Sequence, residues 1–163
     1  MTNLSRIAVV TVKSPSTLRV KWRGKTVSDD INLAGWIATG GGTLAALRDP
    51  KVFARAAIGN YGAAIAWDDG DLAIDALHLR KLANEQKPFT SAEVKSWQEA
   101  TKVSNNEAAD LLGVALSTWN AYKAGGSPVP TTVAMLCRAT LRDPILMQAH
   151  FRPRATGRPR KVV

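Results

Sequence analysis

A cluster of aspartates, Asp68, Asp69, Asp71 and Asp75, could carry chemistry in this sequence. Carboxylates at such close spacing could bind calcium or act as a paired acid and base. An EF-hand loop, however, is closed by a bidentate glutamate, and none stands at the required position. We therefore interpret the cluster as a solvated hairpin turn followed by a helix cap.

Two further patterns imitate parts of enzyme sites. Gly24-Lys25-Thr26 matches the end of a phosphate-binding P-loop, but Arg19 stands where that motif needs a glycine. His78 and His150 lie far apart in the sequence, and no Ser, Cys or Asp near either belongs to a recognisable nucleophile motif. The sequence therefore predicts no catalytic residue, no metal site and no cofactor, and we do not expect an enzyme.

The composition is that of a globular protein. The chain has 163 residues, of which 45% are hydrophobic, enough for one ordinary domain or two small ones. No apolar run approaches the roughly 18 residues of a membrane span, and the N-terminal segment lacks the apolar core of a signal peptide. We expect no membrane association and a cytoplasmic location. The single cysteine, Cys137, excludes a disulfide framework and is expected in the core.

The charge is basic and unevenly distributed. A formal net charge of +9 favours polyanionic partners such as nucleic acid. Residues 1–88 carry 12 Lys and Arg against 8 Asp and Glu (net +4), and residues 89–149 carry 5 against 5 (net zero). Residues 150–163 hold five basic residues and no acid. Such a tail can also be no more than a solvated, disordered end.

The first half of the sequence predicts a small α+β domain over residues 1–84. Residues 6–13 and 18–22 have the β-branched and alternating patterns of a hairpin or meander. Asp49-Pro50 is expected to begin a short helix over 50–55, because aspartate caps helices and proline suits their first position. Residues 57–67 predict a second hairpin that 68–70 close, and from 71 onward the pattern changes to helix.

The second half predicts an all-helical domain of about five helices over residues 89–151. Thr90 with Glu93, and Ser104 with Glu107, are capping-box patterns that begin two helices. Gly113 ends the second of them, since glycine readily takes the positive φ found at helix C-termini. After a short turn comes a helix over about 116–123, and segments 131–141 and 144–149 complete the domain.

This helix pair resembles the helix-turn-helix of phage-repressor (Xre-like) proteins. The resemblance rests on Glu107-Ala-Ala-Asp-Leu-Leu-Gly113-Val114, followed by Ser117-Thr118-Trp119 and Lys123-x-Gly125. It implies that Trp119 and Tyr122 face the core while the second helix enters the DNA major groove. The DNA-binding residues would then be Ala115, Leu116, Ser117, Thr118, Asn120, Ala121 and Lys123.

The expected chemistry of that outward face is hydrogen bonding without strong charge. Ser117 and Thr118 could bond a base or a phosphate, and Asn120 could read adenine through two hydrogen bonds. Leu116 could contact a thymine methyl group. Because the face has no arginine or glutamine, sequence readout is expected to be modest. The alternative is a helix-turn-helix used only for contact with protein.

Residues 152–163 are predicted to form a basic, disordered tail. Thr156-Gly157-Arg158-Pro159-Arg160-Lys161 resembles an AT-hook, whose extended Gly-Arg-Pro core lies in A·T-rich minor grooves. An arginine beside a proline can insert into a narrow groove of enhanced negative potential. We assign DNA contact to Arg152, Arg154, Arg158, Arg160 and Lys161. Neutralising about five phosphates predicts a slope of roughly −4 to −5 in log affinity against log salt.

The first domain resembles domain of unknown function 2442, a small bacterial α+β fold found alone or joined to a C-terminal helix-turn-helix. The matching residues are Leu47-Arg-Asp49-Pro50-x-x-Phe53 and Ile65-Ala-Trp67-Asp68-Asp69-Gly70-Asp71-Leu72-x-x-Asp75-x-Leu77. The glycine triplet at 40–42 departs from that pattern. No established activity comes with the family, so the resemblance implies the two-domain architecture alone.

Together these patterns predict a DNA-binding transcription regulator of the repressor type whose partner is double-stranded DNA. Its N-terminal domain would self-associate or bind a protein partner, and a homodimer is expected because repressor-class modules act on paired half-sites. The alternative is a protein-interaction or antitoxin-like module with only non-specific DNA contact.

Overall fold

The computed structural model describes residues 5–155 and divides the chain into two compact units, Met1–Lys87 (unit 1) and Pro88–Val163 (unit 2). All strands of the described residues lie in unit 1, and the described part of unit 2 has five helices. The predicted α+β class is confirmed. None of the helices within residues 5–155 is both long and apolar enough to span a membrane.

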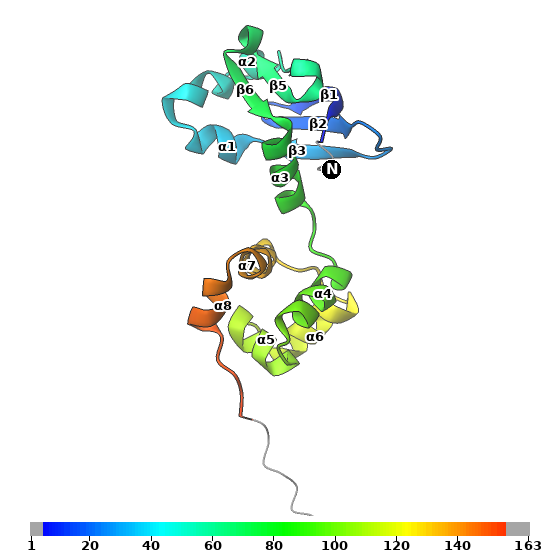
Figure 1. The fold of residues 1–163 in the computed structure, drawn as a ribbon, viewed down its shortest axis with the longest axis vertical. Helices are drawn as coiled ribbons and strands as arrows, with labels where there is room; N and C mark the ends of the chain where they lie inside the picture. Colours follow the sequence, from blue (N-terminus) through cyan, green and yellow to red (C-terminus); the bar gives the residue numbers. More distant parts are fainter. Residues whose placement is uncertain (1–4, 156–163) are drawn as a thin grey trace, which may run out of the picture. The chain divides into compact units, whose positions relative to one another are not determined.

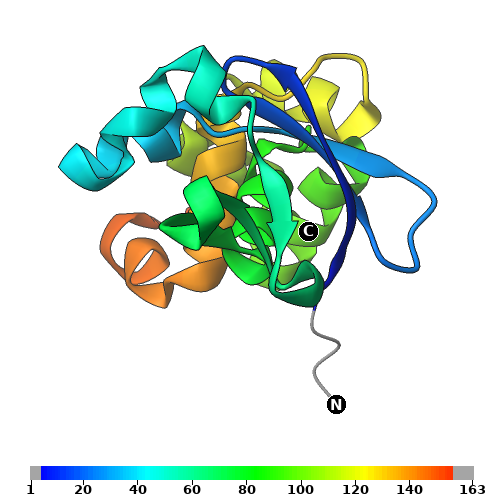
Figure 2. The ribbon, with the colours of Figure 1, turned by 90° about the horizontal axis from the view of Figure 1, so that it is seen from above.

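Unit 1 opens with an antiparallel meander of β1 (Ile7–Ser14), β2 (Thr17–Trp22) and β3 (Ser28–Asn32), paired in that order. Leu18, Val20 and Trp22 alternate into the core and are at most 3% exposed, while Arg19 between them faces away. This two-residue period explains why the segment forms a half-buried strand. Gly24, with φ +75°, lies in the turn that follows β2, and the loop that contains it extends beyond the rest of unit 1 (Figures 1 and 2).

Short helices follow the meander: α1 (Ala34–Thr39), the 3-10 helix η1 (Gly41–Arg48) and α2 (Pro50–Phe53). The predicted start of α2 is confirmed, because Asp49 Oδ1 accepts a hydrogen bond of 2.8 Å from the backbone N–H of Lys51. The helix is shorter than predicted and ends at Phe53. We did not predict α1 and η1, whose apolar pattern the three glycines at 40–42 interrupt.

A second antiparallel sheet consists of β4 (Ala57–Gly59), β5 (Ala64–Trp67) and β6 (Leu72–Asp75), joined by the single 3-10 turns η2 (Asn60–Gly62) and η3 (Asp68–Gly70). The predicted hairpin over 57–67 is confirmed. The predicted helix from residue 71 is wrong, because Leu72–Asp75 pairs with β5 and α3 (Ala76–Gln86) begins afterwards. In the sequence this strand is indicated by the alternating apolar residues Leu72 and Ile74, and a pattern this short does not distinguish a strand from a helix.

The core of unit 1 surrounds two tryptophans. Trp67 is 1% exposed, and its ring lies tilted against that of Phe53 with the centroids 5.8 Å apart. Its Nε1 donates to the Phe53 carbonyl at 3.0 Å. Trp22 donates to Asp29 Oδ2 at 2.6 Å, and the guanidinium of Arg80 on α3 lies 4.8 Å from its ring centre. Gln86 bonds both backbone groups of Asn32 on β3. These contacts hold α3 against the meander.

Unit 2 contains α4 (Ser91–Thr101), α5 (Asn105–Leu112), α6 (Leu116–Ala124), α7 (Thr131–Arg142) and α8 (Pro144–His150). Both predicted capping boxes are present, at the starts of α4 and α5. Asp143 caps α8 through the backbone N–H of Ile145 at 3.0 Å. Figure 1 shows α4, α5 and α6 close together, with α7 and α8 following them in the chain.

Gly62 provides a test of the packing between β1 and the second sheet. It has φ +85°, and a Cβ atom there would lie 2.5 Å from the carbonyl oxygen of Ile7. We expect Gly62→Ala to lower the free energy of unfolding of unit 1 by about 2 kcal/mol, measured by urea denaturation and circular dichroism. Gly35→Ala in α1 is the control, since its Cβ would meet nothing within 4 Å. Equal losses of unfolding free energy in the two variants would contradict the close approach of Gly62 to the Ile7 carbonyl.

Cys137 provides a test of the core of unit 2. Its side chain is fully buried, as predicted, and burial raises the pKa of the thiol from 9.0 to about 12. Since the thiolate is the reactive form, we expect a thiol reagent at pH 8 to label the protein only when unit 2 opens. The neutral thiol stabilises the fold fully below about pH 9, and this contribution is lost as the pH rises towards 12. Labelling as fast in buffer as in urea would contradict this burial.

Candidate nucleic-acid interface

The centre of the candidate interface is the turn between α5 and α6. Gly113 follows α5 in the left-handed conformation at φ 67°, and its N–H bonds back to the last turn of that helix. Val114 and Ala115 complete the connection before α6 begins at Leu116. Glycine takes this conformation without steric cost, which lets the chain change direction over three residues.

The inner face of α6 is fixed in the core by aromatic residues. Trp119 is fully buried and Tyr122 is 5% exposed, which confirms that both are core residues. The ring of Trp119 meets that of Trp97 on α4 edge to face, with centroids 5.6 Å apart. Trp97 in turn donates to Thr140 Oγ1 on α7 at 2.9 Å. One chain of contacts therefore joins α6 to α4 and α7.

Asn105, the first residue of α5, is a polar junction that sequence reasoning missed. Its Oδ1 accepts from Trp119 Nε1 at 3.2 Å, from Lys123 Nζ at 2.9 Å and from Gln98 Nε2 at 3.0 Å. The amide oxygen thus links α4, α5 and α6 and satisfies the polar atom of the buried indole. The sequence alone does not distinguish the role of Asn105 from that of the adjacent Asn106.

The outward face of α6 carries the residues assigned to DNA. Leu116 is 41% exposed, and Ala115, Ser117 and Asn120 are also exposed. Partial burial is shared by three others: Thr118, Ala121 and Lys123. Lys123 is hydrogen-bonded to Asn105 within the protein. The structure therefore brings the hydroxyl and amide groups together on one exposed surface and holds the lysine at the other end of the helix.

The start of α6 differs from the starts of α4 and α5. Each of those helices has a capping box that satisfies its first backbone amides. The residue before α6 is Ala115, which forms no side-chain cap. First-turn N–H groups without a side-chain acceptor can bond an external anion, and the helix dipole favours negative charge at that end.

The described part of the basic tail lies against unit 2. Arg154 donates from Nε and Nη2 to both carboxylate oxygens of Asp110 on α5, at 2.7 and 2.9 Å. Arg152 bonds the carbonyls of Ala149 and Phe151. The other three tail residues assigned to DNA, Arg158, Arg160 and Lys161, lie outside the described residues, as does the AT-hook-like segment.

The acidic cluster of unit 1 is divided among separate contacts. Asp68 pairs with Arg55 at 2.9 Å, and Asp75 caps α3 by accepting from the backbone N–H of His78. This agrees with the interpretation as a hairpin turn and a helix cap. Within residues 5–155 no three His, Cys, Asp or Glu side chains are grouped so that they could hold a metal ion.

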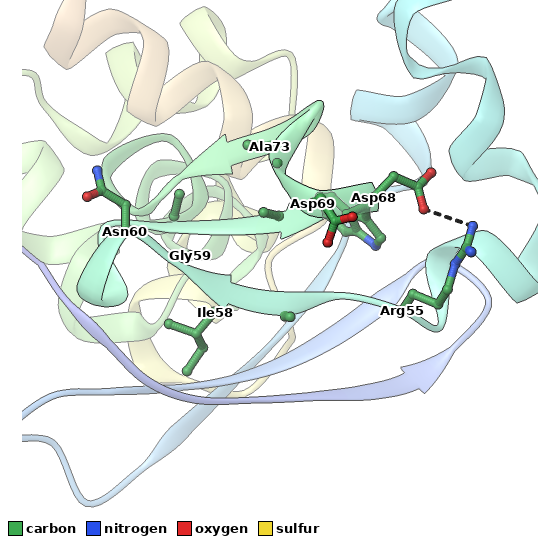
Figure 3. Close-up of a pocket in the computed structure, with 12 residues that line it drawn as sticks. Arg55, Ile58, Gly59, Asn60, Asp68, Asp69 and Ala73 are labelled. Carbon is green, nitrogen blue, oxygen red and sulfur yellow. Dashed lines mark ion pairs between the residues drawn. The ribbon is translucent and has the colours of Figure 1, made fainter.

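Beside Asp68, the outer face of the second sheet forms an open hollow of about 720 Å³. Figure 3 shows the Arg55–Asp68 pair at one end of this hollow and Asn60 at the other. Its floor consists of small residues, namely Ala57, Gly59, Ala64, Ala66 and Ala73.

Comparisons with known proteins provide little further information. No protein-family model and no curated protein sequence matches this chain, so the resemblances to domain of unknown function 2442 and to Xre-like proteins stay predictions. A crystal structure from Nitrosomonas europaea ATCC 19718, described as a "Putative DNA Binding Protein", is similar at 20% identity. The similarity covers 94% of this chain and 96% of that chain, with a TM-score of 0.47. A likeness at this level carries no inference about what this chain binds.

The Asn105 junction can be tested by removing its oxygen. We expect Asn105→Ala to lower the free energy of unfolding of unit 2 by about 1–2 kcal/mol, because the buried indole N–H of Trp119 loses its acceptor. Asn105→Asp keeps an oxygen in place and is expected to retain most of the stability. Urea denaturation gives both values, with Asn106→Ala as the exposed neighbouring control. If Asn106→Ala lost as much unfolding free energy as Asn105→Ala, the proposed role of the Asn105 oxygen in stabilising unit 2 would be wrong.

Proposed function

We propose that this protein binds double-stranded DNA through unit 2 and regulates transcription as a repressor-type helix-turn-helix protein. The observation that carries the proposal is α6 itself: its inner face is fixed by Trp119, and its exposed N-terminal half starts without a side-chain cap. A helix with its side chains is about 10–12 Å wide, which suits the major groove of about 12 Å.

The exposed groups of α6 suit a base-reading role of limited strength. Ser117 and Asn120 carry the hydrogen-bonding groups, and Leu116 offers an apolar contact for a thymine methyl group. The backbone amides of the first turn would bind a phosphate and set the register of the helix. No arginine occurs within Leu116–Ala124, so the basic residues of the C-terminal segment would supply most of the electrostatic attraction.

We expect the tail to make fewer phosphate contacts than the five that the sequence predicted. Arg154 is engaged by Asp110, which leaves Arg152, Arg158, Arg160 and Lys161 of the five basic residues beyond residue 149. Four phosphate contacts correspond to a slope of roughly −3.6 in log affinity against log salt. These residues would lie in the minor groove next to α6, as basic arms do beside helices in the major groove.

A second candidate is a protein-interaction or antitoxin-like module that holds DNA only loosely. The balance of five acidic and five basic residues over 89–149 favours it. So do the exposed side chains of Leu141 and Ile145 near the α7–α8 junction, 52% and 62% exposed. Unit 1 would then bind the protein partner or a second copy of the chain.

Selection from a pool of random duplex DNA at physiological salt separates the two candidates. We expect the full chain to enrich a motif, and a chain ending at Ala155 to enrich the same motif with lower affinity. An inverted repeat with half-sites about one helical turn apart would indicate a dimer. Binding without enrichment that disappears on truncation would contradict the regulator and support the loose module.

The contribution of α6 is measured on the enriched motif. We expect Ser117→Ala with Asn120→Ala to weaken binding to that motif by about tenfold, because base-edge hydrogen bonds are lost. Binding to random duplex should remain within about twofold, since phosphate contacts dominate it. Ser96→Ala, exposed on α4, is the control. A uniform loss on both DNAs would contradict base reading by α6.

A further inference from the structure

The central strand of the meander carries a row of cations on one face. Leu18, Val20 and Trp22 of β2 point into the core. The residues that alternate with them point outwards and are exposed, namely Arg19, Lys21 and Arg23. Arg23 lies one residue beyond β2, but its backbone N–H donates to the Arg6 carbonyl at 2.7 Å, which continues the pairing with the first strand. Cations at every second position therefore follow this face for about 13 Å.

The neighbouring strands leave this side of the sheet open. On β1, Val9 lies opposite Lys21 and is 50% exposed. On β3, Ser28 lies opposite Lys21, and Asp30 lies opposite Arg19. Residues directly opposite each other in antiparallel strands are close neighbours on one side of the sheet. We call this side of the meander, together with the adjoining loop 23–27, the basic face.

The carboxylate of Asp30 on the basic face already has a partner. It accepts from Arg19 Nε and Nη2 at 2.7 and 2.8 Å. The pairing with Arg19, first through its hydrogen bond, and the nearby charge of Lys13 hold the pKa of the Asp30 carboxyl below its ordinary value. Three further cations of the face form no side-chain hydrogen bond or ion pair with any of residues 5–155, namely Lys21, Arg23 and Lys25.

The basic face accounts for the whole formal net charge of residues 5–149. Five cations and one carboxylate give it a charge of +4, namely Lys13, Arg19, Lys21, Arg23, Lys25 and Asp30. This equals the net charge of residues 1–88, so the other seven basic and seven acidic residues of that range balance. Residues 89–149 also have a net charge of zero. Within residues 5–149, the net attraction for a polyanion therefore comes from unit 1.

We propose that the basic face is a second DNA-contacting surface, which holds the sugar-phosphate backbone of a duplex through Lys21, Arg23 and Lys25. One strand of B-DNA carries a phosphate for about every 3.4 Å of helix axis, so a row of about 13 Å is long enough to meet about four of them. This rests on the proposed function, which supplies duplex DNA as the ligand, and extends it to unit 1. Because both units belong to one chain, contacts made by each add to the affinity for the same duplex.

The side chains of the basic face favour a phosphate backbone over an anionic membrane. Membrane-surface segments combine basic residues with Trp, Phe or Leu side chains that enter the lipid. Val9 and Val27, which are 50% and 74% exposed, are the large apolar side chains that this face exposes within residues 5–155. The hydroxyl groups of Thr11 and Ser28 beside the cations can donate to phosphate oxygens. Duplex DNA is therefore the partner that this surface fits.

Removal of the unpaired cations from the full chain tests the basic face. The face variant replaces all three by glutamine: Lys21→Gln, Arg23→Gln and Lys25→Gln. The control removes the same charges from exposed positions of unit 1 outside the face: Arg48→Gln, Lys51→Gln and Lys81→Gln. On a mixed-sequence duplex, we expect the slope of log affinity against log salt to become shallower by about 2.7 in the face variant, about 0.9 for each lost phosphate contact.

The slope of the control variant should stay within about 0.5 of the wild-type value, because its three cations contact no phosphate. Equal changes of slope in the two variants would overturn the basic face and leave the proposed function intact.

Asp30 provides a test whose expected result is a gain, which misfolding cannot imitate. Asp30→Asn removes the carboxylate of the face and frees Arg19 for a phosphate, so we expect binding to the same duplex to strengthen about two- to fivefold. Asp71→Asn removes the same charge from the turn before β6 and is the control. Equal affinities of the two variants for the duplex would count against the basic face.

Selection from random duplex DNA separates phosphate contact from base reading. Phosphate contacts carry no direct sequence information, so we expect the face variant to enrich the same motif as the wild-type chain. A different motif would overturn the assignment of the face to the phosphate backbone.

Sedimentation with phosphatidylserine-containing vesicles tests the membrane as partner. We expect the wild-type chain and the face variant to sediment equally. Vesicle binding that the face variant loses, with its DNA binding unchanged, would overturn the assignment to DNA. A wild-type chain that binds no duplex DNA would overturn both the basic face and the proposed function.

Discussion

Burial of the Trp119 indole is the contact on which the candidate interface depends. A helix as short as α6 is unstable in water by itself, and only two of its residues, Trp119 and Tyr122, are buried. The edge-to-face contact with Trp97 and the bond to Asn105 fix both the position and the rotation of α6. Because the indole occupies the inner side, the hydroxyl and amide groups must lie on the outer side.

Local sequence signals predicted where several helices begin and where α5 ends. The capping boxes at Thr90 and Ser104, the proline starts at Pro50 and Pro144, and the glycine at Gly113 all act through neighbouring backbone groups. Such signals are visible in the sequence because cause and effect lie within one helical turn. The core positions of Trp119 and Tyr122 were predicted from the resemblance to repressor helix-turn-helix proteins, and the burial of Cys137 from the burial tendency of a free cysteine in an apolar stretch.

The features that were missed depend on contacts between distant segments. Strand β6 is a strand because it pairs with β5, and four residues carry too little periodicity to show this. The Arg154–Asp110 pair joins positions 44 residues apart, and an arginine in a basic tail gives no sign that it is held by the body of the protein. The assignments of Arg158, Arg160 and Lys161 lie outside the described residues and stay predictions.

The small residues on the outer face of the second sheet affect how unit 1 can evolve. Ala57 opposes Ala66, Gly59 opposes Ala64, and Ala66 opposes Ala73, while Ile65, Trp67 and Ile74 fill the opposite face. Larger side chains on the outer face would extend into the hollow without displacing those buried residues, because neighbouring positions on a strand point to opposite faces. Mutational drift at these positions can therefore change the shape and charge of one surface of unit 1 while its core packing stays constant.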